Sequence, residues 1–282
     1  MRLRVMVSRH SAFYSPLIAT LGAGFLHREG LDAEYSILGK GQRSHELIRD
    51  GVVDVMQSAV SSNWKPQERG ESPLPVHFAL INRRDGFFLV SQAEPNGEFT
   101  WKSLEGKSLL ADHGLQPLVM LKYALQYNGV DASTIRIIDA GSPEEMQDAF
   151  RSGAAEYGHF QAPSAGVPIV SVGASMPEVA FSTLCVSQGF VASETCAAFL
   201  KAYRGARDWV RTVDAAEVAE AEKAFFPRVE LSDLAEAITR YQKIGCWDGS
   251  IEITRDLYEQ ALTVFESVGE IRDRAALPFQ SR

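Results

Sequence analysis

The sequence has few cysteines and no long apolar run. Its three cysteines, Cys185, Cys196 and Cys246, are odd in number and lack the C-x-x-C spacing of a metal or redox site. They therefore do not indicate a disulfide framework, and we expect small buried residues in a reducing compartment. No apolar stretch approaches the about 20 residues that a membrane-spanning helix needs. We predict no insertion into a membrane.

The chain also lacks an excess of basic residues. It has 28 Lys and Arg against 36 Asp and Glu, which gives a net charge of -8. This balance argues against nucleic acid or an anionic membrane surface as the main partner, although a locally positive surface remains compatible with it. A hydrophobic content of 45% over 282 residues is ordinary for a globular protein and is enough for two domains.

Signals for export and for cofactor binding are missing as well. Met1 leads directly into an apolar strand-like segment, without the charged start and cleavage site of a signal peptide. We expect a cytoplasmic protein on that basis, or a periplasmic one if the natural start had been trimmed. There is no G-x-x-x-x-G-K-[ST] loop, no dinucleotide fingerprint and no close metal-ligand spacing. We expect neither a cofactor nor a metal.

The first 58 residues carry the strongest structural pattern. Residues 3–7, 32–38 and 52–58 are typical of strands, and residues 16–29 and 44–50 of helices. Ser15 followed by Pro16 is a favourable helix start, because Ser can cap free N–H groups and Pro loses no hydrogen bond at the first helical position. This alternation predicts parallel strands with ligands at their carboxyl ends.

The same order recurs in the second part of the chain. A strand is predicted at 108–111, a helix begins near Gln116, and Gly129-Val130-Asp131 ends it as Gly30-Leu31-Asp32 ends the first helix. A further strand at 135–138 and a helix from Ser142 follow. The repeated punctuation predicts two similar lobes, the alternative being one long doubly wound sheet.

The remaining segments complete the predicted organisation. We expect a loop at 64–75, a first crossover at 82–86 and a return strand at 179–186, followed by C-terminal helices with apolar residues at three- and four-residue spacing. The predicted fold is α/β and two-lobed, each lobe a mainly parallel sheet flanked by helices. Lobe 1 would comprise residues 1–83 and 187–282, lobe 2 residues 84–186, with a ligand cleft between them.

Several short motifs resemble those of a known family. They are Pro16-Leu17-Ile18-Ala19, Glu29-Gly30-Leu31-Asp32, Gly51-Val52-Val53-Asp54, Leu104-Glu105-Gly106-Lys107 and Pro143-Glu144-Glu145-Met146. The sequence thereby resembles type II periplasmic-binding-protein folds, in the branch of sulfonate- and nitrate-binding proteins and thiamine-pyrimidine synthases. The resemblance implies hinge closure on a small ligand and delivery to an ABC-transporter permease.

Some members of that branch are enzymes instead. The pyrimidine synthases carry a cofactor-bearing Lys at the end of the third strand and a His four residues later, where this sequence has Gln57 and Ser61. The desulfinases use a cysteine in the first loop, and residues 8–15 contain none. The enzyme that remains open is a cofactor-independent lyase acting on an aromatic carboxylate or sulfinate, with His10 or His113 as general acid.

Loops that follow the predicted strands supply the candidate ligand contacts. Arg can hold a planar oxyanion bidentately, helix starts at Pro16 and Pro117 offer free N–H groups, and aromatic side chains can form a flat wall. Structural roles are the alternative for each, core packing for Phe13 and Tyr14 and salt bridging for Arg83. The candidates are Arg9, His10, Ser11, Phe13, Tyr14, Lys40, Gly41, Ser58, Ser61, Arg83, His113, Gln116, His159 and Gln161.

These features leave three functions open. The first is a substrate-binding protein that holds a small anionic, planar or aromatic molecule without chemistry. The second is the lyase, and the third is a ligand sensor that reports to a partner protein. The resemblance favours the first, whereas the absent signal peptide and the histidines favour the second.

Overall fold

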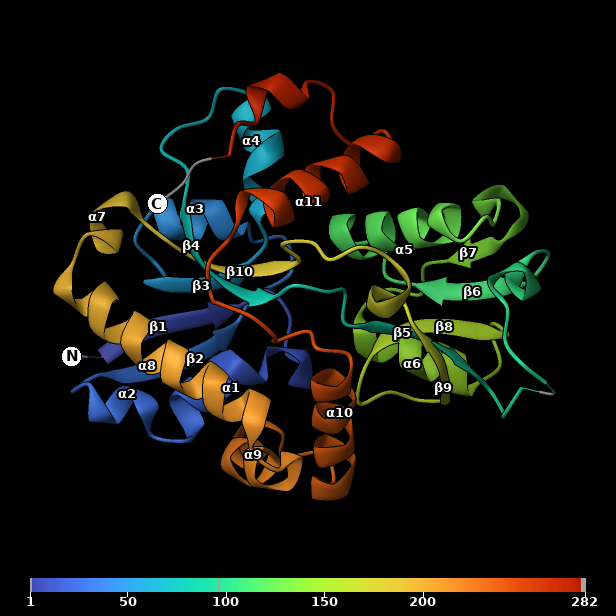
Figure 1. The fold of residues 1–282 in the computed structure, drawn as a ribbon, viewed down its shortest axis with the longest axis horizontal. Coiled ribbons are helices and arrows are strands. Elements are labelled where there is room, and N and C mark those ends of the chain that lie inside the picture. The colour runs from blue at the N-terminus through green and yellow to red at the C-terminus, as the bar shows by residue number, and fades with distance from the viewer. Residues whose placement is uncertain (1, 96, 280–282) are drawn as a thin grey trace. The chain divides into compact units, whose positions relative to one another are not determined.

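The computed structural model describes residues 2–95 and 97–279, which form two compact units. Unit 1 comprises Met1–Arg83, Val179–Ala261 and Asp273–Arg282, and unit 2 comprises Arg84–Glu178 and Leu262–Arg272. Each unit has its own five-stranded sheet (Figure 1). The alternative of one continuous doubly wound sheet is therefore wrong.

The sheet of unit 1 has the strand order β2-β1-β3-β10-β4. The first three, β1 (Arg2–Val7), β2 (Asp32–Ile37) and β3 (Val55–Ser58), are parallel, and β10 (Ser182–Val186) runs antiparallel to both β3 and β4 (Val76–Asn82). Leu3, Val5 and Val7 on one face of β1 are completely buried, and Arg2 and Arg4 on its other face are exposed.

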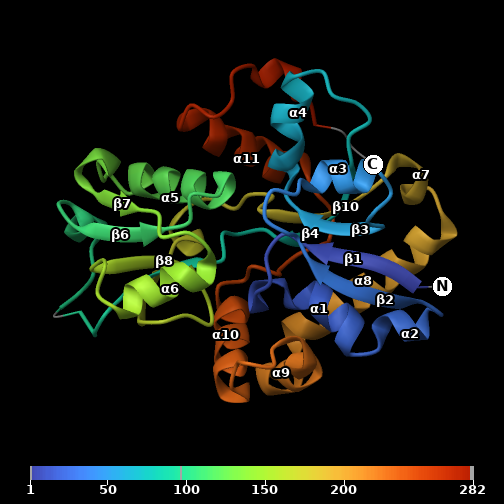
Figure 2. The ribbon, with the colours of Figure 1, turned by 180° about the vertical axis from the view of Figure 1, so that it is seen from behind.

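Helices cover both faces of this sheet. In Figures 1 and 2, α1 (Ser15–Gly22), α2 (Phe25–Arg28) and α8 (Glu194–Thr212) lie on one face, and α3 (Ser44–Arg49) lies on the other. The other helices that lie wholly in unit 1 are α4 (Trp64–Glu68), α7 (Gln188–Val191), α9 (Ala215–Glu222) and α10 (Leu231–Lys243), with the 3-10 turns η1 (Ala12–Tyr14), η2 (Val60–Asn63), η6 (Lys223–Phe225) and η7 (Arg274–Ala276). Helix α11 (Arg255–Ser267) begins in unit 1 and ends in unit 2.

The sheet of unit 2 has the order β7-β6-β8-β5-β9. Here β6 (Ser108–Ala111), β7 (Arg136–Ile138) and β8 (Tyr157–Gln161) are parallel, and β5 (Phe87–Ser91) is antiparallel to β8 and β9 (Val167–Ser171). Helices α5 (Leu115–Tyr127) and α6 (Pro143–Arg151) lie on opposite faces (Figures 1 and 2). The 3-10 turns are η3 (Trp101–Leu104), η4 (Ala132–Thr134) and η5 (Gly173–Ser175).

The predicted similarity of the two helix ends is confirmed by equivalent hydrogen bonds. Gly30 (φ 69°) and Gly129 (φ 73°) both adopt the left-handed conformation that favours glycine. In the first unit Leu31 N–H donates to the Leu26 carbonyl at 3.0 Å, and in the second Val130 N–H donates to the Leu125 carbonyl at 2.9 Å. The same glycine cap therefore turns the chain from helix to strand in both units.

Two predicted elements differ in the structure. Residues 16–29 form two helices rather than one, because the chain turns at Gly24, whose φ is 75°. Helix α1 also begins at Ser15, with Tyr14 as its N-cap, so Ser15 is not the cap we predicted. The predicted loop at 64–75 begins with helix α4.

The two units divide differently from the predicted lobes. The first division, between Arg83 and Arg84, falls where we expected it, but the second falls between Glu178 and Val179 instead of after residue 186. Strand β10 makes the difference, because it pairs with β3 and β4 and so belongs to the sheet of unit 1. Residues 262–272 belong to unit 2 instead of lobe 1. A strand signal in the sequence does not say which sheet the strand joins.

Candidate functional site

The carboxyl ends of β2, β1 and β3 lie at one edge of the sheet in unit 1, because these neighbouring strands are parallel. Buried Gln57 holds the first loop at this edge. The main-chain N–H and the hydroxyl of Ser8 both donate to Gln57 Oε1, each at 2.9 Å. The hydroxyls of Ser44 and Ser58 lie 3.3 Å apart and join the start of α3 to the end of β3. We call this surface the carboxyl edge of unit 1.

Cationic side chains follow the strands at this edge. Arg9 comes two residues after β1 and is half-buried, and Lys40 comes three residues after β2 and is exposed. Among the described residues, Lys40 has no hydrogen bond or ion pair. Gly41 is exposed, and its φ of 81° turns the loop. Lys40 is thus accessible, and its predicted contact with a ligand stays a prediction.

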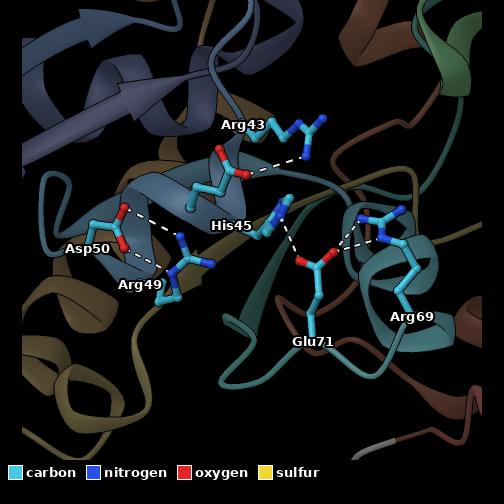
Figure 3. Close-up of polar contacts among 7 residues, drawn as sticks. Arg43, His45, Arg49, Asp50, Arg69 and Glu71 are labelled. Carbon is cyan, nitrogen blue, oxygen red and sulfur yellow. Dashed lines mark hydrogen bonds and ion pairs between the residues drawn. The ribbon is translucent and has the colours of Figure 1, made fainter.

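An ion-pair network lies next to this loop (Figure 3). Glu71 accepts from Arg69 at 2.7 Å and lies 3.3 Å from His45 Nε2, so it joins the loop after α4 to the start of α3. The hydrogen bond from Arg69 is the main cause that lowers the pKa of Glu71. Sequence reasoning missed Arg69 and Glu71, because residues 24 and 26 positions from His45 carry no local signal of such a pairing.

His10 does not have the ligand-contacting or catalytic role that we predicted for it. Its Nδ1 lies 2.7 Å from the Tyr35 hydroxyl, its Nε2 lies 2.9 Å from the Phe225 carbonyl, and its ring stacks on Phe226 at 4.3 Å. Burial lowers the pKa of His10. The neutral ring thus accepts from Tyr35 and donates to Phe225, and both nitrogens are occupied within unit 1.

The predicted aromatic wall is also part of the core. Phe13 is 0% exposed and Tyr14 is 4% exposed, and Phe13 packs on Phe181 with ring centroids 5.4 Å apart. Ser11, predicted as a ligand contact, caps η1 by accepting from Phe13 N–H at 3.2 Å. Every residue from 11 to 20 is buried, so the start of α1 is not an open anion site.

A buried carboxyl group lies beneath α1. The Ser15 hydroxyl is 2.8 Å from both the Ala12 carbonyl and Glu222 Oε2. Ser15 has one hydrogen to donate, and burial raises the pKa of Glu222 well above its ordinary value. Burial thus favours the protonated form of Glu222, and that form can donate to Ser15 while Ser15 donates to Ala12. We missed this residue, although an acid in register with Ala215, Val218 and Ala219 on an apolar helix stripe was a visible signal.

The carboxyl edge of unit 2 has a different composition. After β6, Asp112 Oδ1 accepts from Gly114 N–H at 2.6 Å, which shapes the turn into α5. His113 is exposed, with Nδ1 3.0 Å from the Ala111 carbonyl and 3.8 Å from Asp139. Helix α5 begins at Leu115 with no side-chain cap bond, and Gln116 beside it is half-buried. Free N–H groups at a helix start favour anions, so anion binding at this helix start stays our prediction.

Strand β8 places one candidate in the core and one at its carboxyl end. His159 is 0% exposed and stacks on Phe87 with ring centroids 4.3 Å apart, so it packs inside the sheet instead of at a ligand. Gln161 ends β8, and its amide nitrogen and oxygen are shielded from solvent without a hydrogen-bond partner in the described chain. An unsatisfied buried amide favours a ligand that supplies the missing partners.

The other predicted contacts lie apart from the loop tips. Ser58 and Ser61 are buried, and Arg83 donates to the Asp248 carbonyl at 3.1 Å within unit 1. Within residues 2–95 and 97–279, no three His, Cys, Asp or Glu side chains come together to hold a metal ion. Searched over the same residues, no helix is long and apolar enough to span a bilayer.

Comparison with known proteins places the fold. No protein-family model matches the chain. The YtlA protein of Bacillus subtilis (strain 168), named provisionally as a binding protein, is 25% identical over 96% of this chain and 84% of its own length.

Two solved structures agree closely with the chain at low sequence identity. The alkanesulfonate-binding protein SsuA from Xanthomonas axonopodis pv. citri, bound to MOPS, gives a TM-score of 0.72 at 12% identity over 97% of this chain and 95% of its own. The periplasmic nitrate-binding protein NrtA from Synechocystis PCC 6803 gives 0.68 at 14% identity over 98% and 83%. The chain has the type II periplasmic-binding-protein-like fold that these substrate-binding proteins share.

Proposed function

We propose that this protein binds a small organic anion as the ligand-binding component of an ABC-type import system. The observation that carries the proposal is the carboxyl edge of unit 1, where Arg9 and Lys40 follow neighbouring parallel strands of an acidic protein. The fold supports it, since solved neighbours with this fold are named for binding sulfonate and nitrate.

The groups that would bind the anion differ between the units. Unit 1 offers the two cationic side chains of Arg9 and Lys40. Unit 2 offers the uncapped start of α5, beside which Gln116 lies, and the unsatisfied amide of Gln161. Charged donors and helix N–H groups both favour sulfonate, carboxylate or phosphate oxygens. The proposal therefore concerns the acidic head of the ligand, because Phe13 and Tyr14 are core residues and lend no support to an aromatic wall.

The lyase alternative loses its main candidate in unit 1. A general acid must present a proton to the substrate, and both ring nitrogens of His10 are bonded to Tyr35 and Phe225. His113 remains exposed, but the solved neighbours that we cite are named as binding proteins. We therefore propose binding without turnover.

Thermal melting with a panel of sulfonates, carboxylates, nitrate and sulfinates tests this function. A ligand at about one hundred times its dissociation constant should add about 2.7 kcal/mol of stability, which is a shift of several degrees. Each compound is then recovered and checked chromatographically. A shift with the compound intact supports the proposal. Consumption of the compound, or no shift with any anion, contradicts it.

The transport role needs its own test. We propose that the protein delivers its ligand to a permease, which would require it to act outside the cytoplasmic membrane. Cell fractionation of the native gene product and ligand uptake in a deletion strain measure both parts. Normal uptake in the deletion strain would remove the transport role while leaving ligand binding intact.

A further inference from the structure

Unit 1 contains a cavity that none of the predicted site residues lines. It measures about 80 Å³ and lies among η2, α4, the start of β4, α11 and the segment after η7. All of its walls belong to unit 1. The lining residues are Val60, Asn63, Trp64, Gln67, Pro75, Val76, His77, Ile253, Tyr258, Pro278 and Phe279.

Aromatic rings that are held in place form much of the wall. Trp64 Nε1 donates to the Tyr258 hydroxyl at 3.0 Å, and that hydroxyl donates to the Leu277 carbonyl at 3.3 Å. The rings of Tyr258 and Phe279 lie 5.5 Å apart. Because these bonds fix the ring planes, the cavity presents flat apolar surfaces before any ligand arrives.

Two lining residues each have an unsatisfied polar atom. Asn63 Nδ2 donates to the Pro75 carbonyl at 2.8 Å, but Asn63 Oδ1 has no partner in the described chain. His77 Nδ1 lies 2.7 Å from the Thr183 hydroxyl, and His77 Nε2 likewise lacks a partner. Both atoms are shielded from solvent, and buried polar groups without hydrogen bonds are costly and uncommon. A ligand in this cavity can supply the hydrogen-bond partners that these two atoms lack.

No charged side chain lines this cavity, although the Arg255 guanidinium lies over the outer wall, 5.1 Å from the centroid of the Phe279 ring. Its lining contains no Asp, Glu, Lys or Arg. Burial lowers the pKa of His77 to about 3, so its ring is neutral at physiological pH. This separates the cavity from the carboxyl edge of unit 1, which carries Arg9 and Lys40. A charged ligand would lose its hydration here without gaining a counter-ion.

We propose that this cavity is a second binding site of the protein, for a small neutral ring compound bearing an N–H donor, such as a primary amide or an azole. The ring packs against the contacting pair of Trp64 and Tyr258, whose ring centroids lie 5.9 Å apart, and the N–H group donates to Asn63 Oδ1. Entry is past Phe279, which is half-buried, whereas Leu277 before it is buried and the Ala276 carbonyl accepts from Gln67 at 2.8 Å.

The size of the cavity limits what it can hold. A dry cavity of about 150 Å³ accepts benzene, and a single water needs only about 10 to 15 Å³. The space of about 80 Å³ is about half of the benzene value. A small ring therefore enters only in part, with its remainder toward Phe279, and a bulky solute is excluded.

The experiment uses the full chain and ligand-observed NMR titrations with benzamide, benzoate and toluene. Benzamide supplies the N–H donor and the ring, benzoate has the same shape with a charge, and toluene has only the ring. We expect saturable benzamide binding at least tenfold tighter than that of either other compound. Asn63→Leu, which removes the acceptor, should weaken benzamide at least fivefold, and Phe279→Ala, which removes part of the wall near the chain end, should weaken it several-fold.

Lys65→Ala is the matched control, because Lys65 lies on α4 but does not line the cavity. It should leave benzamide binding unchanged, and circular dichroism of each variant checks folding. Absence of saturable benzamide binding overturns the proposal, and so does benzoate binding of equal strength. Unchanged affinity in both Asn63→Leu and Phe279→Ala overturns it too. None of these outcomes bears on Arg9 or Lys40, so the proposed function is tested separately.

Discussion

Units 1 and 2 have the same order of parallel strands and helices, but different side chains lie at the carboxyl ends of their strands. In the strand register, Val7 lies opposite Gln57 in unit 1, and Ala111 lies opposite His159 in unit 2, at the last paired position of each. Gln57 and His159 are therefore equivalent. Gln57 holds the first loop of unit 1 through Ser8. His159 stacks on Phe87 instead, and the loop after β6 is shaped by the hydrogen bond from Gly114 N–H to Asp112.

The register also changes which loop residues correspond. Arg9 and His113 both come two residues after the last paired position, so Arg9, not His10, is the counterpart of His113. Unit 1 buries the start of its first helix and relies on cationic side chains, and unit 2 leaves the start of α5 uncapped. One backbone pattern thus supports two ways of binding an anion, by charge and by main-chain N–H groups.

The largest expected effect comes from breaking the loop attachment of unit 1. Gln57→Leu removes the side-chain acceptor of two Ser8 donors. The Ser8 N–H keeps the Gln57 carbonyl at 3.3 Å, but the Ser8 hydroxyl loses its partner, so the change should cost about 2 kcal/mol of unfolding free energy. Urea denaturation measures it. Ser8→Ala, which removes one donor and keeps the acceptor for the N–H, should cost about 1 kcal/mol. Equal costs for the two variants would contradict the role given to Gln57.

The next effect separates the two ways of binding an anion. For an anion found by thermal melting, Arg9→Ala and Lys40→Ala should each weaken binding about tenfold, or about 1.4 kcal/mol, with fold stability little changed. Raising the salt concentration should weaken the wild-type protein more than either variant. Titration calorimetry measures both. Affinity that is independent of salt would show that cationic side chains do not hold the ligand.

Glu222 should make the unfolding free energy of unit 1 depend on pH. None of the groups described above in unit 2 is a counterpart of it. Its folded pKa is raised, so its contribution to stability is fully present below the ordinary pKa near 4.5 and is lost as pH rises through the folded pKa. Glu222→Gln keeps a donor for Ser15 and cannot ionise, so it should flatten the loss of unfolding free energy that begins as pH rises above about 4.5. Exposed Glu220, two residues earlier on α9, supplies the control Glu220→Gln, which should change nothing. An unchanged pH slope in Glu222→Gln would mean that the carboxyl group is not the cause.

The sequence predicted the fold better than it predicted the residues of the candidate site. The helix ends at Gly30 and Gly129 depend on local sequence, because a single glycine is enough to adopt the left-handed cap. Each glycine recurs at the end of the corresponding helix in its unit. Contacts of a side chain are not local. His10 reaches Phe225, more than two hundred residues later, so nothing near it in the sequence distinguishes a ligand contact from a core histidine.

The aromatic residues of the first loop illustrate the same limit. Phe13 and Tyr14 were equally compatible with a ligand wall and with the core, and packing of Phe13 on Phe181 and Tyr241 decided for the core. Lys40 was predictable because an exposed cation on a loop needs no distant partner. The sequence is therefore informative where a residue acts alone and silent where the residue acts through a distant neighbour.

The smallest effect on stability tests unit 2. Gln161 holds a shielded amide without a partner, so Gln161→Met, of similar length, should leave stability unchanged or raise it by about 0.5 to 1 kcal/mol, because an unpaired polar group is removed. If the amide instead serves the ligand, the same variant should weaken anion binding several-fold. Stability and affinity would then move in opposite directions, which is the mark of a residue kept for function at a cost to the fold. Gln126→Met, on the exposed surface of α5, is the control and should move neither quantity. Weakened folding together with unchanged affinity would assign Gln161 to the framework of unit 2 instead of to a ligand.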